Sequence, residues 1–320
     1  MNFKNDVEAL DGLRSKFEEL KSEITKVIYG QDEVITQVLI SLFSRGHVLL
    51  IGVPGLAKTL LVTTIADILG LKYNRIQFTP DLMPPDIIGT EILDKERQFK
   101  FNRGPLFANI ILADEINRTP PKTQSALLEA MQERAVTAAG QRFELDAPFF
   151  VLATQNPIEQ EGTYPLPEAQ LDRFMFSVWL GYPKFEDELT IVKNTTSTLQ
   201  FNLNPVISGK EILFYQDLIR KVPINDNVLK YAVTLAAKTR PGNPLTAPVS
   251  EQYIKWGAGP RASQYLVLGA KTHAALFGKY SPDIEDVQAV APSILRHRII
   301  KNYKAEAENI SVDEIISKLI

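Results

Sequence analysis

The feature that most constrains the fold of this chain is one eight-residue stretch, Gly52-Val53-Pro54-Gly55-Leu56-Ala57-Lys58-Thr59. It follows the apolar run 47–51 and precedes a helical pattern that ends at Gly70, a typical helix cap. A short buried strand, a loop of small residues and a helix that opens on Lys-Thr bind phosphates through backbone N–H groups. The lysine then reaches the terminal phosphates, and the threonine hydroxyl binds Mg²⁺. Ala57 stands where the strict pattern has a second glycine, so the loop alone predicts a nucleotide site of unspecified class.

Composition limits the classes of protein that this chain can belong to. Its 320 residues, 45% of them apolar, are enough for two packed domains. Cysteine is absent, which excludes disulfides and thiolate metal sites. The net charge of −3 gives no global field that would attract nucleic acid or an anionic membrane. The histidines lack metal-ligand spacing; they are His47, His273 and His297.

The sequence also bears on location. It has no uninterrupted apolar run of the roughly 18 residues that a membrane span requires. The first eight residues are charged and lack the apolar core of a signal peptide. We therefore expect a soluble cytoplasmic protein.

Two carboxylates follow the apolar run 109–113 directly, as Asp114 and Glu115. In a parallel α/β sheet the carboxyl ends of the strands face the ligand crevice, so both acids are expected beside the phosphates. One can hold Mg²⁺ through its water shell, and the other can polarise an attacking water. Alone, the pair is equally typical of an ordinary turn. Together with the phosphate loop it favours a hydrolytic site.

The next buried strand, 149–154, delivers Asn156 to the same crevice, although an asparagine before proline is also a common cap. Ahead of the phosphate loop, a helical pattern over 7–27 ends at the turn Gly30-Gln31. A nucleotide base has room there against Ile28, but a simple helix break has the same spacing. The residues leave both alternatives open.

Beyond these motifs, we expect a proline-rich loop over 79–89 and hairpins near 90–101 and 136–145. In the first hairpin, basic side chains alternate with phenylalanines, as they do on surfaces that bind nucleic acid. Acidic residues lie beside them, which favours an ordinary solvent-exposed hairpin. Composition shifts at 181–210, after which helices are predicted over 211–220, 226–238, 262–277, 283–295 and 311–320. Arg261 lies at a helix start, which disfavours a cation unless it faces an anion.

Taken together, the motifs resemble those of the AAA+ ATPases and, within them, the MoxR family, from about Val27 to Arg298. The most specific pieces are the phosphate loop and Leu112-Ala113-Asp114-Glu115-Ile116-Asn117-Arg118, Ala153-Thr154-Gln155-Asn156-Pro157, Leu171-Asp172-Arg173-Phe174 and Gly259-Pro260-Arg261-Ala262-Ser263. Ala57 is usual in MoxR proteins, which favours this family over P-loop kinases.

The resemblance implies an α/β fold, an AAA+ P-loop NTPase core with a parallel sheet, followed by a smaller all-α lid domain. We expect an N-terminal helix over 1–30, the core over 31–185, a linker over 186–210 and the lid over 211–320. The core then contains two hairpins, about 90–103 and 135–147, which resemble the helix-2 and pre-sensor-1 insertions. These hairpins are candidate contacts for substrate or partner in a ring.

The resemblance also implies roles for individual residues, with ATP and Mg²⁺ as cofactors. Lys58 and Thr59 look like the Walker A pair, Thr59 and Asp114 like the metal ligands, and Glu115 like the catalytic base. Asn156 matches sensor 1, Arg261 matches sensor 2 of the lid, and Arg173 looks like the arginine finger that reaches the neighbouring subunit. The base of the nucleotide is expected to bind at Ile28, Gly30 and Gln31.

In function, the chain resembles ATP-hydrolysing, chaperone-like remodelling proteins that form hexameric rings. MoxR relatives are associated with von Willebrand factor A domain proteins and with complex assembly, maturation or metal insertion in client proteins. The alternative is a DNA-directed AAA+ motor or helicase-related ATPase, against which the charge of −3 and the lack of a DNA-binding module count. A small-molecule kinase would leave sensor 1 and the lid arginine without a use.

Overall fold

The computed structural model describes residues 3–93, 97–159, 162–196 and 202–320. Its α-helices are α1 (Asp6–Thr25), α2 (Asp32–Phe43), α3 (Lys58–Leu69), α4 (Pro84–Ile88), α5 (Pro121–Glu133), α6 (Glu168–Leu171), α7 (Phe185–Thr195), α8 (Gly209–Lys221), α9 (Asp226–Lys238), α10 (Pro248–Tyr253), α11 (Pro260–Leu276), α12 (Ile284–Leu295), α13 (Tyr303–Ala307) and α14 (Val312–Ser317). Two 3₁₀ turns are η1 (Ile116–Arg118) and η2 (Arg296–Arg298). The strands are β1 (Val48–Ile51), β2 (Tyr73–Gln77), β3 (Gly89–Leu93), β4 (Phe99–Arg103), β5 (Ile110–Asp114), β6 (Ala135–Ala138), β7 (Gln141–Glu144), β8 (Phe150–Gln155), β9 (Phe176–Trp179), β10 (Ile254–Trp256) and β11 (Ile300–Lys301).

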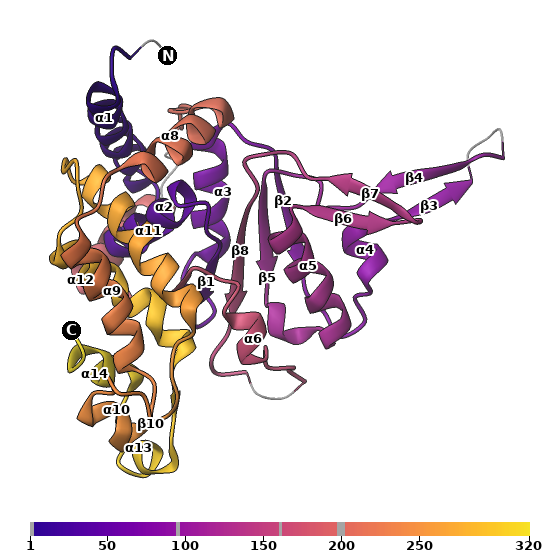
Figure 1. Ribbon diagram of the computed structural model, residues 1–320. Coiled ribbons are helices and arrows are strands. Elements are labelled where there is room, and N and C mark those ends of the chain that lie inside the picture. Colours follow the sequence, from indigo (N-terminus) through magenta and orange to yellow (C-terminus); the bar gives the residue numbers. More distant parts are fainter. Residues whose placement is uncertain (1–2, 94–96, 160–161, 197–201) are drawn as a thin grey trace.

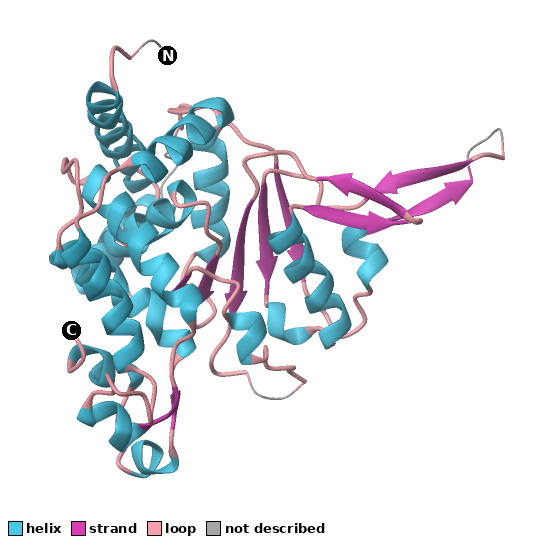
Figure 2. Ribbon diagram, viewed as in Figure 1, coloured by secondary structure: helices cyan, strands magenta, loops and turns pink. Residues whose placement is uncertain are grey.

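The central sheet has five parallel strands in the order β2-β5-β8-β1-β9. Its middle strands are nearly continuous apolar runs, as expected where helices cover both faces (Figure 2). All five carboxyl ends therefore lie at one edge, which is where the phosphate loop and the acidic pair emerge. The predicted α/β core with a parallel sheet, followed by helices, is confirmed.

Side chains of β1 alternate between two apolar clusters. Leu49 packs in the cluster beneath α4 and α5, whereas Val48 and Leu50 pack on the opposite face. The second cluster continues without interruption through α1 and α2 into the C-terminal helices, where Leu266 of α11 is fully buried. The N-terminal helix, the sheet and the C-terminal helices thus share one core.

The two predicted hairpins are present as β3–β4 and β6–β7. Figure 1 shows them reaching away from the body, on the side of the sheet opposite α1 and α11. They contact each other through Phe101 and Phe143, whose rings stack with centroids 4.4 Å apart. Residues 94–96, part of the predicted first turn, lie outside the described residues.

The structure adds elements that the sequence did not predict. The expected proline-rich loop contains α4, because Pro84 and Pro85 occupy the first helical turn and the Asp86 carboxylate accepts a hydrogen bond from the Met83 N–H. The C-terminal helices at the predicted positions are joined by α10, α13 and the short antiparallel pair β10–β11. The lid therefore carries a small strand pair beside its helices.

The predicted linker over 186–210 holds most of α7, and residues 197–201 within it lie outside the described residues. The division into 1–30, 31–185, 186–210 and 211–320 stays a prediction. Across the described ranges, no helix combines the length and the apolar composition that crossing a membrane requires.

Candidate active site

The phosphate loop joins the end of β1 to the start of α3. Gly55 has φ +87°, and Ala57, the residue before α3, has φ +54° and ψ +27°. This left-handed conformation costs an alanine roughly 1–2 kcal/mol more than a glycine. Ala57 therefore adopts the backbone geometry that the missing glycine would provide, and the departure lies in the residue type alone.

Lys58 folds back over the loop, where its Nζ donates a hydrogen bond to the Gly52 carbonyl at 2.7 Å. Partial burial lowers the pKa of Lys58, and the nearby carboxylates of Asp114 and Glu115 oppose that shift. The ammonium thus lies in the field of the acidic pair, at the mouth of the loop. Thr59 follows on the first turn of α3 and is half-buried.

Asp114, the last residue of β5, is only 7% exposed, and both carboxylate oxygens are engaged. Oδ1 accepts from the Thr154 hydroxyl of β8 at 2.6 Å. Oδ2 accepts from the Arg75 guanidinium of β2, at 2.7 Å from Nη2 and 3.1 Å from Nε. Neighbouring strands on both sides therefore orient this carboxylate.

Glu115 follows in a left-handed conformation, φ +56°, which is uncommon for a residue other than glycine and is concentrated at functional sites. Its N–H donates to the Thr154 hydroxyl at 2.8 Å. Its Oε2 accepts from Gln77 Nε2 at 2.9 Å and from Arg118 Nη1 at 3.0 Å. Glu115 is held as a hydrogen-bond acceptor beside Asp114.

The sequence assigned no role to the four partners of this pair, Arg75, Gln77, Arg118 and Thr154, although Arg118 and Thr154 lie within the quoted motifs. A signal was available, because the alternating run 73–78 is typical of a strand and Gln77 is its last polar residue. Gln77 lies opposite Asp114 in the parallel register of β2 and β5. The strand order that makes them neighbours was not part of the sequence prediction.

The residues present fit a magnesium site. Mg²⁺ binds through one or two carboxylates plus waters and substrate phosphates, and Thr59 and Asp114 supply the oxygen ligands it prefers. The Arg75 guanidinium on Asp114 shows that this carboxylate accepts a cation. Within the described residues no group of three or more metal-ligating His, Cys, Asp or Glu side chains occurs.

Asn156 comes directly after β8, the strand between β5 and β1, and is buried. The preceding residue, Gln155, accepts a hydrogen bond from the Gly52 N–H at 3.2 Å, so Asn156 lies between the acidic pair and the phosphate loop. Its Oδ1 accepts from the Ile158 N–H at 3.1 Å, a local turn contact. The sensor 1 role stays a prediction.

A cavity of about 430 Å³ lies beside the phosphate loop and is mainly apolar, with the size and character of a small-molecule pocket. Its walls include Ile28, Gln31, Gly55, Leu56, Ala57 and Leu180. Gly30 lines an adjoining cavity, and an added Cβ there would approach the Asp187 carboxylate within 2.6 Å. The predicted base-binding residues thus surround one place.

Arg173 and Arg261 lie elsewhere. Both line a cavity of about 190 Å³ with Arg45, Arg134 and His47, the residue just before β1. This arginine-lined cavity is at the amino end of β1, whereas the phosphate loop is at its carboxyl end. The Arg173 guanidinium donates to the Leu128 carbonyl at 2.6 Å, and that of Arg261 pairs with Asp172 at 3.3 Å. The structure brings the two predicted arginines together, but at the opposite end of the strand from their own phosphate loop.

His47 lies buried in the wall of the arginine-lined cavity. Its Nδ1 accepts from the Val151 N–H at 3.0 Å, so the proton belongs on Nε2, which faces the Met131 carbonyl at 3.3 Å. Burial lowers the pKa of His47 to about 4, and Arg134 adds to that shift. The imidazole is therefore neutral in the folded protein at pH 7.

This neutral histidine predicts an acid-sensitive fold. Its folded pKa of about 4 lies below an unfolded value near 6.5, so the unfolded chain binds the proton first. The contribution of His47 to stability is complete above pH 6.5 and falls by about 1.4 kcal/mol per pH unit as the pH drops toward 4. We expect His47→Gln to lose less unfolding free energy than the wild type between pH 7 and pH 5.5. Urea unfolding at both pH values measures this, and equal losses would contradict it.

Comparison with known proteins places these features. Residues 47–176 match the profile of the ATPase family associated with various cellular activities (AAA), and residues 246–319 match the AAA lid domain. Over 299 residues the chain is 43% identical to Chaperone MoxR1 of Mycobacterium tuberculosis, covering 93% of this chain and 79% of that protein. The chain belongs to the MoxR family of AAA ATPases. Membership of this ATPase family implies that the protein binds and hydrolyses ATP.

Three further proteins also match most of the chain. The chain is 41% identical to the uncharacterized protein YeaC of Bacillus subtilis, covering 93% of this chain and 91% of that one. It is 30% identical to Protein MoxR of Methylorubrum extorquens, covering 87% and 85%. A crystal structure of a candidate ATPase from Cytophaga hutchinsonii superposes with a TM-score of 0.90 at 45% identity, covering 98% of this chain and 95% of that one.

Proposed function

We propose that this MoxR-family protein hydrolyses ATP at sites shared between neighbouring subunits and uses the energy to remodel protein partners. The observation that carries the proposal is the separation of two halves of one site. Asp114 and Glu115 lie with the phosphate loop at one end of β1, while Arg173 and Arg261 line the cavity at the other end. A second copy can bring the two halves together.

The proposed hydrolysis is mainly a matter of positioning and charge. Lys58 neutralises the terminal phosphates, Asn156 orients the attacking water, and Glu115 takes the proton from it. When bound, Mg²⁺ neutralises phosphate charge, and Thr59 and Asp114 are the residues that hold it. The Thr154 hydroxyl on Oδ1 and the Arg75 guanidinium on Oδ2 orient the Asp114 carboxylate for that role.

Arg173 and Arg261 are the proposed contribution of the adjacent subunit. Both side chains line one cavity, which suits binding of a single anion such as the γ-phosphate presented by a neighbour. This changes the expectation for Arg261, which in this arrangement serves the neighbour's nucleotide. A closed ring, proposed to be hexameric, gives every phosphate loop such a neighbour.

The proposed client is a protein, with a von Willebrand factor A domain protein as the proposed partner and assembly, maturation or metal insertion as the proposed outcome. The name of the relative Chaperone MoxR1 supports this class. The β3–β4 hairpin adds support, since Leu93 and Phe99 are 61% and 72% exposed near its end. Exposed apolar side chains suit contact with polypeptide. Among the basic residues of this hairpin, Arg103 is engaged within its own chain, because it packs over the Phe107 ring. The cytoplasmic location stays a prediction.

Capture of the client tests this function. Glu115→Gln protein loaded with ATP should retain a specific protein from its own cell extract, whereas Lys58→Ala protein, which lacks the phosphate contact, should not. Mass spectrometry identifies the retained chains, and a nuclease-treated extract gives the same result if the client is a protein. Retention of nucleic acid alone would favour the DNA-directed alternative.

A further inference from the structure

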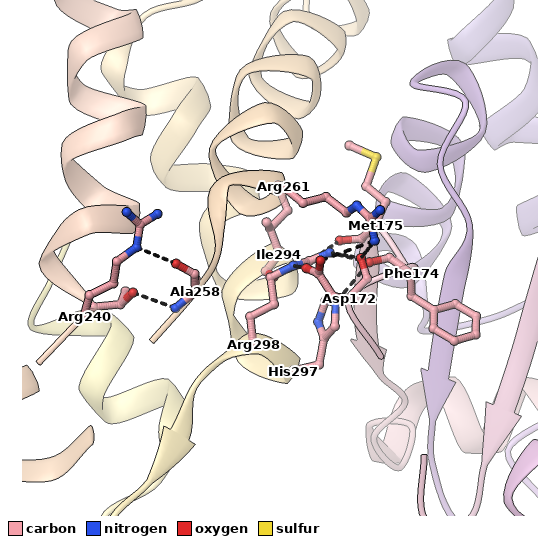
Figure 3. Close-up of polar contacts among 10 residues, drawn as sticks. Asp172, Phe174, Met175, Arg240, Ala258, Arg261, Ile294, His297 and Arg298 are labelled. Carbon is pink, nitrogen blue, oxygen red and sulfur yellow. Dashed lines mark hydrogen bonds and ion pairs between the residues drawn. The ribbon is translucent and has the colours of Figure 1, made fainter. Parts of the chain in front are cut away.

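Arg298, the last residue of η2, is an almost completely buried cation. Its Nε lies 2.7 Å from Asp172 Oδ1, and burial lowers its pKa while Asp172 opposes that shift. The ring of Tyr265 on α11 lies against the guanidinium, with its centroid 5.2 Å from Cζ. Figure 3 shows Arg298 reaching from the C-terminal helices toward the loop that precedes β9.

The hydrogen bonds of Arg298 concentrate on the main chain around Arg173. Nη2 donates to the carbonyls of Asp172 at 3.0 Å and Phe174 at 2.6 Å, and Nη1 donates to that of Met175 at 3.2 Å. Nη1 also donates to the Ile294 carbonyl of α12, the helix that precedes η2. One side chain therefore fixes the backbone on both sides of Arg173.

Asp172 extends this connection to Arg261. Its Oδ1 binds Arg298, and its Oδ2 lies 3.3 Å from Arg261 Nη1. Arg298 is thus connected to both arginines of the arginine-lined cavity. It reaches Arg173 through the main chain on either side of that residue, and Arg261 through the Asp172 carboxylate. A planar guanidinium with five donors can make this set of contacts, whereas a lysine ammonium cannot reproduce the fork.

We propose that Arg298 is a positioning residue that holds Arg173 in place to complete the ATP site of the neighbouring subunit. This inference rests on the proposed function, because Arg173 acts there on another chain. Arg298 itself touches no nucleotide. Its effect on hydrolysis passes through Arg173, and it therefore belongs to the face that donates the arginine and not to the face that binds ATP.

Arg298→Lys in the full-length protein tests the proposal, since it keeps the charge opposite Asp172 and loses the fork. We expect ATP affinity within about twofold of wild type and a loss of kcat on the order of 10²-fold, the size that a displacement of about 1 Å produces. Arg14→Lys is the control, because it makes the same chemical change in an exposed ion pair with Glu18 on α1, and Arg14 is not among the residues that line the arginine-lined cavity. It should keep the wild-type kcat.

Mixing of subunits separates positioning from a general loss of structure. Arg298→Lys subunits mixed with Glu115→Gln subunits should regain activity. The Arg298→Lys subunits retain the catalytic base Glu115, and the Glu115→Gln subunits retain a correctly held Arg173. Mixed with Arg173→Ala subunits, they should regain none, because both variants fail on the same face. In an Arg173→Ala background, Arg298→Lys should reduce kcat much less than it does in the wild type.

The outcomes are distinct. A wild-type kcat for Arg298→Lys, or activity that Glu115→Gln subunits fail to restore, overturns the role of Arg298. If Arg173→Ala mixed with Glu115→Gln also fails, the shared site itself is wrong. Should Arg298→Lys lower the melting temperature too far for assay, Asp172→Asn replaces it. That variant removes the carboxylate that both Arg298 and Arg261 contact, and it should show the same mixing pattern.

Discussion

Glu115→Gln is expected to lower kcat for ATP hydrolysis by about 10²–10⁴-fold, the range typical of a general base, while ATP stays bound. Glutamine can still accept hydrogen bonds from Gln77 and Arg118, so the local structure is preserved. It cannot take a proton from the attacking water. Phosphate release measures hydrolysis, and nucleotide retained after gel filtration measures binding.

The control for this variant is Glu144→Gln. Glu144 lies on the exposed hairpin strand β7, where it pairs with Arg142. Glu144→Gln makes the same chemical change at a distance from the phosphate loop, so hydrolysis at the wild-type rate is expected. If Glu115→Gln also hydrolyses ATP at that rate, Glu115 is not the base, and the acidic pair serves the metal alone.

Arg173→Ala should leave ATP binding nearly unchanged and remove most hydrolysis. In GTPases an arginine finger is worth on the order of 10³–10⁵ in rate, because it stabilises charge that develops only in the transition state. Arg173 lies at the opposite end of β1 from its own phosphate loop, so the loss belongs to the neighbouring site. Steady-state hydrolysis at saturating ATP, compared with equilibrium nucleotide binding, separates the two effects.

Mixed assemblies test where the arginine acts. Arg173→Ala subunits retain the catalytic base Glu115, and Glu115→Gln subunits retain Arg173. In a mixture, some interfaces therefore combine an intact Glu115 from one subunit with an intact Arg173 from its neighbour. Activity should therefore exceed the sum of the two variants measured alone. Arg142→Ala, a surface arginine of β7, should behave as wild type throughout. If no mixing ratio restores activity, Arg173 does not act across an interface.

The parts of the site that could be predicted are those in which local sequence carries the geometry. The phosphate loop, its helix and the cap at Gly70 follow from consecutive residues, and Gly70 has the expected left-handed conformation. The acidic pair emerges at the end of its strand as predicted, because an apolar run that ends in two carboxylates has one favourable placement in a parallel sheet.

The parts that could not be predicted depend on strand order and on contacts between distant residues. Arg75 meets Asp114 because β2 pairs with β5, a fact of topology that no local pattern contains. Arg298 lies 126 positions after Asp172, and its charge in a helical sequence is typical of an exposed surface. The position of Arg261 at the far end of β1 likewise depends on how the C-terminal helices dock.

The apolar core shared by α1, the sheet and α11 has a mechanical consequence. Hinge closure between domains requires a boundary crossed by few contacts. Here Leu13, Leu50 and Leu266 belong to one buried cluster. The ion pair between Arg298 and Asp172 also joins the C-terminal helices to the loop before β9. We therefore expect such a subunit to resist hinge closure between the sheet and the C-terminal helices. In the proposed ring, we expect ATP turnover to shift whole subunits against one another, and the projecting hairpins would then move with the subunit that carries them.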